Sequence, residues 1–118
     1  MGSLDQPPRA GSLRLLQVEH KRWLDHNFPG QTREQIMLGM TEELGELAHH
    51  LLKREQQIRG GDDVDHEAEI RDACADLVIF MMGLADLEGF ILMDAILEAW
   101  DTVKRRDWVR YPINGVDQ

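Results

Sequence analysis

From residue 30 to residue 111 the chain contains no proline, and this stretch lacks the alternation of apolar and polar residues that is typical of strands. A proline inside a helix removes a backbone hydrogen bond and clashes with the preceding turn, so its absence leaves long helices possible. Breaks are expected at Phe28-Pro29-Gly30, in the polar segment 59–63 and at Glu88-Gly89. We therefore predict an all-α fold. Its four helices would span residues 13–27, 33–57, 65–87 and 92–108.

The second predicted helix has a recognisable start and one apolar face. Thr32 precedes it and Gln35 follows three residues later, which resembles a capping box. At about 100° per residue, its apolar residues at spacings of four, three and four form one narrow stripe. The residues of this stripe are Met40, Leu44, Leu47 and Leu51. In the first helix we expect Leu16, Trp23 and Leu24 to face inward.

The third predicted helix is apolar on nearly all sides. A helix of this kind must be covered by several neighbours. Four helices in a chain of 118 residues do not supply them. The sequence therefore predicts a homo-oligomer, either a dimer or a tetramer, in which long helices form a shared bundle.

Charge and cysteine content exclude several classes of protein. The formal net charge of −9 argues against general binding to DNA or RNA, which requires a basic surface. Cys74 is the single cysteine, so no intrachain disulfide can form, and its apolar surroundings predict a buried thiol. Residues 1–12 are expected to be a flexible tail without the apolar core of a signal peptide, and residues 13–118 a single helical domain. No apolar run is long enough for a membrane span, and the cytoplasm is the expected location.

Two acidic clusters lie on the second and third predicted helices. The first is Glu42-Glu43-Leu44-Gly45-Glu46, and the second is Glu69-Ile70-Arg71-Asp72 followed by Asp76. Carboxylates three or four residues apart on a helix repel each other, and those beside an apolar face also lose hydration. A divalent cation commonly compensates this cost, and carboxylate oxygens favour Mg²⁺ or Mn²⁺. If the two helices are antiparallel, both clusters can meet around one cation. A solvated acidic helix face is the alternative.

Cations and aromatic residues form two further groups. Lys104, Arg105 and Arg106 could hold phosphate oxygens, although cations at a helix carboxyl end are also favoured by the helix dipole. Aromatic residues could stack against a nucleobase or lie in the core. They are Trp23, Phe28, Trp100 and Trp108.

These residues resemble the MazG-like nucleotide pyrophosphohydrolases of the all-α NTP pyrophosphatase superfamily. The signature of that family is Glu-Glu-x-x-Glu on one helix and Glu-x-x-Asp on the next. The segment 42–46 matches the first element fully, and Asp76-Leu77-Val78-Ile79-Phe80 resembles the segment that opens with the Asp of the second. The segments 23–29 and 100–108 also resemble parts of family members, so the resemblance spans residues 13–115.

One position departs from the family pattern. The Glu expected three residues before Asp76 is Ala73 in this chain. Asp72, four residues before Asp76, lies on the same helix face and is expected to replace it. In the alternative alignment, Glu69 and Asp72 form the Glu-x-x-Asp element one helical repeat earlier.

The resemblance implies an enzyme that uses Mg²⁺, with Mn²⁺ as a possible substitute, to hydrolyse a (deoxy)nucleoside triphosphate to the monophosphate and pyrophosphate. Such an activity would serve nucleotide-pool house-cleaning. The implied metal ligands are Glu43, Glu46, Asp72 and Asp76. The implied catalytic residues are Glu42, Glu43 and Glu46, with Glu42 as a further ligand or as the acceptor of the proton of water. The implied substrate-binding residues are Trp23, Phe28, Lys104 and Arg106.

Two other interpretations remain open. A non-catalytic helical oligomer of the same fold could bind nucleotide or a protein partner without turnover, and Ala73 favours this. Alternatively, Glu46 and His49 match the Glu-x-x-His pattern of di-iron bundles, but the third helix offers no second copy. For the histidines, ordinary surface positions are therefore expected.

Overall fold

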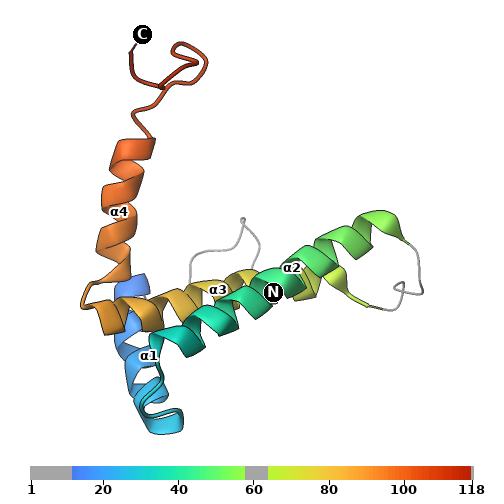
Figure 1. Ribbon diagram of the computed structural model, residues 1–118, viewed down its shortest axis with the longest axis vertical. Helices are drawn as coiled ribbons and strands as arrows, with labels where there is room; N and C mark the ends of the chain where they lie inside the picture. The colour runs from blue at the N-terminus through green and yellow to red at the C-terminus, as the bar shows by residue number, and fades with distance from the viewer. Residues whose placement is uncertain (1–11, 58–63, 118) are drawn as a thin grey trace.

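The computed structural model describes residues 12–57 and 64–117, and these residues contain four helices and no strand (Figure 1). The prediction of an all-α fold with four helices is confirmed. The segment 59–63 and the tail up to residue 11 lie outside the described residues. The helices are α1 (Leu13–Asn27), α2 (Arg33–Gln56), α3 (His66–Glu88) and α4 (Leu92–Val103).

Side chains and one glycine set most of the helix ends. The hydroxyl of Ser12 accepts a hydrogen bond from the backbone N–H of Leu15 and caps α1. The predicted capping box of α2 is confirmed, because Thr32 and Gln35 each accept a hydrogen bond from the other's backbone N–H. Gly89 ends α3 with a φ of +79°, a left-handed conformation that glycine adopts without a steric penalty.

α4 ends at Val103, so the predicted end at Trp108 is wrong. The chain after Val103 folds into turns that are stabilised by Asp107. The Asp107 carboxylate accepts hydrogen bonds from the backbone N–H groups of Val109 and Arg110, and its own N–H donates to the carbonyl of Gly115. Aspartate competes with helical hydrogen bonding in this way, and the sequence pattern alone did not reveal it.

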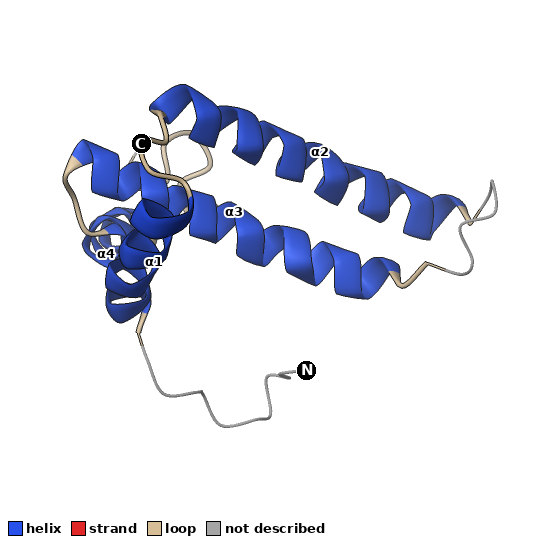
Figure 2. Ribbon diagram, turned by 90° about the horizontal axis from the view of Figure 1, so that it is seen from below, coloured by secondary structure: helices blue, strands red, loops and turns tan. Residues whose placement is uncertain are grey.

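α2 and α3 form a long antiparallel hairpin, which Figure 2 shows side by side along its length. At its base, Arg33 pairs with Glu88 and donates a hydrogen bond to the carbonyl of Leu87 at 2.9 Å. In the middle of the hairpin, a Cβ atom on Gly39 would lie 2.6 Å from two ring atoms of Phe80. The glycine therefore allows the Phe80 ring to pack directly on the backbone of α2.

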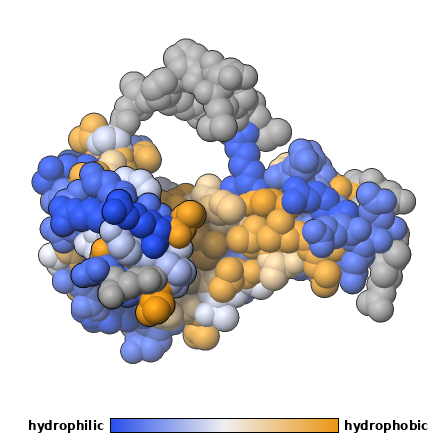
Figure 3. Space-filling model, turned by 90° about the horizontal axis from the view of Figure 1, so that it is seen from above, coloured by the Kyte–Doolittle hydropathy of each residue, from blue (hydrophilic) through white to orange (hydrophobic). Residues whose placement is uncertain are grey.

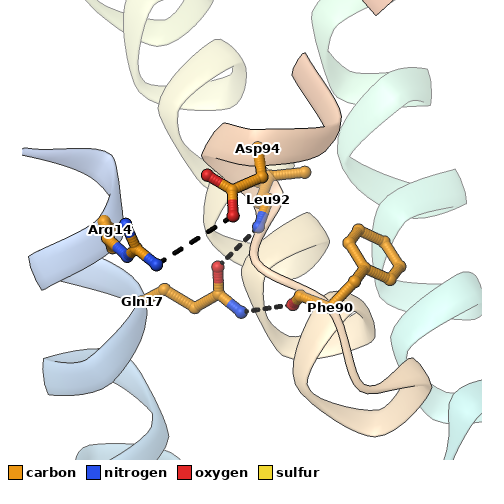
Figure 4. Close-up of polar contacts among 5 residues, drawn as sticks. All are labelled: Arg14, Gln17, Phe90, Leu92 and Asp94. Atoms are coloured by element: carbon orange, nitrogen blue, oxygen red, sulfur yellow. Dashed lines mark hydrogen bonds and ion pairs between the residues drawn. The ribbon is translucent and has the colours of Figure 1, made fainter. Parts of the chain in front are cut away.

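Gln17 joins α1 to the turn between α3 and α4. Its side chain is buried, and its amide nitrogen donates to the Phe90 carbonyl and to Asp86 Oδ1, both at 2.9 Å. Its oxygen accepts from the backbone N–H of Leu92 at 2.8 Å. Figure 4 shows the Phe90 and Leu92 bonds, with the weaker Arg14–Asp94 ion pair beside them. The Gln17 side chain thus supplies hydrogen-bond partners to two backbone groups, the Phe90 carbonyl and the Leu92 N–H, where α4 begins.

Replacing Gln17 by alanine should destabilise the fold by about 2–4 kcal/mol, because it leaves several buried or half-buried polar groups without partners. Urea unfolding monitored by circular dichroism measures the change. Glu19→Ala, at an exposed position of the same helix, is the control and should change stability by less than about 0.5 kcal/mol. Equal stability of the two variants would contradict the assigned role of Gln17.

The described chain buries little of its apolar surface. Its buried apolar residues are Ile36, Ala73, Met82 and Ala85. The expectation that Leu16 and Trp23 face inward is wrong, since they are 50% and 52% exposed, and Leu24 alone of the three is half-buried. α1 instead turns Gln17 and Leu24 toward α3.

The other apolar faces are also uncovered within one chain. Leu44 in the predicted stripe of α2 is 58% exposed, and the thiol of Cys74, predicted to be buried, is exposed as well. No residue of α4 is buried. Figure 3 shows apolar surface along one side of the α2–α3 hairpin, beside the end of α4. These errors have one cause, which is that no helix among residues 12–57 and 64–117 packs against these faces. None of the helices in the described parts of the chain is long and apolar enough to cross a bilayer.

Candidate functional site

A cavity of about 350 Å³ lies where α1, α2 and α3 meet. Trp23 and Phe28 line it from α1 and its end, and Glu43 and Asp76 line it from α2 and α3. The two aromatic rings lie 5.8 Å apart between centroids and are tilted by 59°. The cavity therefore combines an aromatic wall with two carboxylates, and it contains predicted residues from both acidic clusters.

The contact between Gly39 and Phe80 explains why the two carboxylates meet. Glu43 follows Gly39 by four residues on α2, and Asp76 precedes Phe80 by four residues on α3. Residues four apart share one helix face, so the packing of the ring on the glycine aligns Glu43 with Asp76. Ala73, one turn before Asp76, is buried and keeps the two helices close.

Four of the five predicted carboxylates interact electrostatically with the fifth, Glu43. Burial raises the pKa of Glu43 above its ordinary value, and the charges of Asp76, Glu46, Glu42 and Asp72 raise it further. Burial likewise raises the pKa of Asp76, and the charge of Asp72 adds to this. Glu42, Glu46 and Asp72 are themselves exposed and do not line the cavity, whereas Glu43 and Asp76 are half-buried and line it. The structure thus brings together all the predicted metal-binding and catalytic residues.

The donor set fits a hard cation. Within residues 12–57 and 64–117, no three or more His, Cys, Asp or Glu side chains form a ready-made metal cage. Mg²⁺ usually keeps several waters and binds through one or two carboxylates together with substrate phosphates, so it does not require such a cage. Burial first, and neighbouring carboxylates second, raise the pKa values of Glu43 and Asp76, and a bound divalent cation would favour the charged forms of both groups.

Without added metal, this cluster should make the fold less stable as the pH rises. Because the pKa values of Glu43 and Asp76 are raised by folding, the folded chain binds more protons than the unfolded chain between the unfolded and folded pKa values. Their contribution to stability is therefore complete below the unfolded values and is lost as the pH rises through the folded ones. The measurement is the urea midpoint from about pH 4 to pH 7.

The double variant Glu43→Gln, Asp76→Asn tests this contribution, because it removes the two groups whose pKa values are raised and leaves every other titratable side chain in place. The wild type should lose stability relative to the variant as the pH rises. Added Mg²⁺ should reduce that loss in the wild type alone. If the difference in stability between the wild type and the variant did not change with pH, folding would not raise the pKa values of the two carboxylates.

The predicted phosphate-binding cations lie away from this cavity within one chain. Lys104 follows the end of α4 and pairs with Asp101 at 3.0 Å, and Arg106 is exposed in the turns that follow. α4 contacts α1 and α3 near its start and makes no contact with α2 (Figure 1). Trp100 and Trp108 are 56% and 53% exposed and do not line the cavity either.

Some residues of interest were not predicted from the sequence. His20 also lines the cavity, and its position three residues before Trp23 on one helix face was the available signal. The expectation of an ordinary surface position is wrong for His50, whose side chain is 16% exposed. Its Nδ1 lies 3.0 Å from Nδ1 of His66, and its Nε2 lies 4.0 Å from Glu69. This pair links α2 to α3 close to the outer end of the hairpin.

A larger open hollow of about 860 Å³ is lined by residues of α1, α4 and the connection between α3 and α4. It is lined by charges of both signs and by none of the predicted site residues. The smaller cavity is therefore the candidate site, because of the residues that line it and not because of its size. No family model, curated protein or solved structure matches the chain.

Proposed function

We propose that the chain is a Mg²⁺-dependent nucleoside triphosphate pyrophosphohydrolase, which cleaves a (deoxy)nucleoside triphosphate to the monophosphate and pyrophosphate. The observation that carries the proposal is the cavity in which Trp23 and Phe28 stand beside Glu43 and Asp76. The resemblance to the MazG-like enzymes supports the class of reaction.

The residues of the cavity suit the two ends of a nucleotide. The rings of Trp23 and Phe28 offer apolar faces on which a base can stack. Glu43 and Asp76, with Glu46 and Asp72, whose charges act on Glu43, would hold the cation that accompanies the phosphates. Bound Mg²⁺ would neutralise phosphate charge and orient a water molecule. Glu42, which is exposed beside Glu43, would be a further ligand or accept the proton of that water.

We further propose that the chain functions as a homo-oligomer, a dimer or a tetramer. The exposed stripe of α4 includes Ile96, Leu97, Trp100 and Val103. Large exposed apolar faces of this kind usually mark an interface. A second copy would also account for the distance of the cations from the cavity, because a partner chain could place its Lys104 and Arg106 close to Glu43 and Asp76.

A screen of deoxynucleoside triphosphates for pyrophosphate release tests the activity. Release is expected with Mg²⁺ or Mn²⁺ and should stop when EDTA is added. Release that continues in EDTA would contradict the assigned role of the carboxylates.

The second candidate is a protein that binds nucleotide without turnover. It is favoured by Ala73, which is 3% exposed and occupies the position of the family's missing Glu. Calorimetric binding of a nucleotide, without pyrophosphate release across the whole panel, would favour it over the hydrolase.

A further inference from the structure

A pair of histidines joins α2 to α3 close to the outer end of the hairpin, where the two helices still lie side by side (Figure 2). His50 lies about two turns beyond Glu43 on α2, and His66 is the first residue of α3. Their Nδ1 atoms lie 3.0 Å apart, and their ring centroids are separated by 5.2 Å. Neither histidine lines either of the two cavities, so the proposed reaction gives this pair no role.

The contact between the two Nδ1 atoms depends on where each ring carries its proton. It is a hydrogen bond when one ring carries the proton on Nδ1 and the other carries it on Nε2. When both rings carry the proton on Nε2, two Nδ1 lone pairs face each other and repel. A cation between them would turn this repulsion into attraction, and neutral imidazole is the commonest protein ligand of metals. The fold thus brings together two metal-binding atoms from two different helices.

The distance between the two nitrogens is close to that found around a single metal ion. In a tetrahedral Zn²⁺ site with Zn–N bonds of about 2.0–2.1 Å, two ligating nitrogens lie about 3.4 Å apart. The separation of 3.0 Å differs from this by a few tenths of an ångström. Rotation of the two rings about their side-chain bonds would direct both lone pairs to one cation without moving the helices.

The opposite nitrogen of His50 faces a carboxylate. Its Nε2 lies 4.0 Å from Oε2 of Glu69, which follows His66 by three residues on α3. A histidine that binds a metal through one nitrogen usually directs its other N–H to a carboxylate, which orients the ring and makes it more basic. The side chain of His50 is 16% exposed and that of Glu69 is 53% exposed. The ring is therefore held by its neighbours, whereas the carboxylate has room to approach Nε2.

We propose that His50 and His66 form a binding site for a divalent transition metal such as Zn²⁺, which clamps the outer ends of α2 and α3 together. Both Nδ1 atoms would bind the cation, and Glu69 would accept the Nε2–H of His50. No third His, Cys, Asp or Glu side chain completes the site in the described parts of the chain, so water would fill the remaining positions. Imidazole nitrogens suit Zn²⁺ and Cu²⁺, whereas carboxylates suit Mg²⁺, so this site differs in chemistry from the acidic cavity.

Calorimetric titration of the full chain, without a histidine tag, tests the site with Zn²⁺ as the probe. Excess Mg²⁺ is present throughout, because it occupies carboxylate sites but competes weakly for imidazole. One Zn²⁺ should bind per chain, and Cu²⁺ should bind more tightly. The double variant Glu43→Gln, Asp76→Asn should give the same result. Absence of Zn²⁺ binding to the wild type would overturn the inference.

Histidine variants locate the bound metal. His50→Gln and His66→Gln should each weaken Zn²⁺ binding by at least about tenfold, because each removes one of the two ligands. His49→Gln, at the adjacent exposed position of α2, is the matched control and should bind Zn²⁺ like the wild type. Zn²⁺ should raise the urea midpoint of the wild type and of His49→Gln, but not that of His50→Gln. Unchanged binding in His50→Gln, or its loss in His49→Gln, would overturn the inference.

¹⁵N NMR of the wild type identifies the ligating atoms without a substitution. With Zn²⁺ bound, His50 and His66 should each carry the proton on Nε2 and bind the metal through Nδ1. Binding through Nε2 of either ring, or ring signals that do not respond to Zn²⁺, would overturn the inference whatever the folding of the variants. None of these measurements uses a nucleotide, so failure of the metal clamp and failure of the proposed hydrolase are distinguishable.

Discussion

Glu43→Gln should reduce Mg²⁺-dependent pyrophosphate release by about a thousandfold or more. Glu43 lies on the cavity wall, and four other carboxylates act on it, so it is the centre of the acidic cluster. Glutamine keeps the size of the side chain but removes one negative charge and one charged oxygen ligand. Losing one group that stabilises developing charge commonly costs a factor of about 10²–10³, and weaker metal binding adds to this.

The same substitution should make the metal-free protein more stable. The raised pKa of Glu43 means that its charge opposes folding when no cation is present, so a neutral side chain relieves repulsion from Asp76 and Glu46. Thermal unfolding with and without Mg²⁺ measures this. The wild type should gain stability from the metal, and Glu43→Gln should gain much less. A substitution that lowers activity but raises the stability of the metal-free protein marks a functional carboxylate. Replacing a carboxylate that only supports the fold would lower both.

Glu55→Gln is the matched control, because Glu55 lies at the exposed far end of the same helix. It should retain full turnover and an unchanged response to Mg²⁺. Glu46→Gln, three residues after Glu43 on the same helix, should also abolish turnover. Unchanged turnover in Glu46→Gln or Glu43→Gln would reject the hydrolase assignment.

Local signals in the sequence sufficed for most of the fold. Thr32 with Gln35 marks the start of α2, and Gly89 marks the end of α3, since each acts within one helical turn. The end of α4 was missed because Asp107 bonds to backbone groups further along the chain, including the carbonyl of Gly115. Interactions between segments that are distant in the sequence leave no periodic signal.

The candidate site was likewise predictable only where its residues are close together in the sequence. Helical periodicity places Glu43 near Glu46 and Asp72 near Asp76, and the family signature links the two pairs. The approach of α2 to α3 depends on Phe80 packing against Gly39, which no motif indicates. The role of Gln17 depends on a hydrogen bond to Asp86, which lies 69 residues further along the chain, so only the three-dimensional structure reveals it.

Leu97→Asp should dissociate the proposed oligomer into monomers. Leu97 is 57% exposed on α4, a helix with no buried residue, so its side chain is free to contact a second copy. Burying a leucine stabilises an interface by about 1.5–3 kcal/mol, and an unpaired carboxylate in its place adds a desolvation penalty. The dissociation constant should therefore rise by at least about a hundredfold. Analytical ultracentrifugation measures the change, and Glu98→Ala, at the neighbouring exposed position, should leave the mass unchanged.

Dissociation should also remove activity if the cations act across the interface. Arg106 lies beyond α4, whereas the acidic cavity lies between α1, α2 and α3, so one chain does not join them. Glu43→Gln and Arg106→Ala should each be inactive alone, and mixing them should restore turnover, because some mixed oligomers contain one cavity with both groups intact. A mixture that stays inactive while subunits exchange would place the action of Arg106 within its own chain. A wild type that sediments as a monomer would reject the interface itself, since α4 would then expose its apolar stripe to water without a partner.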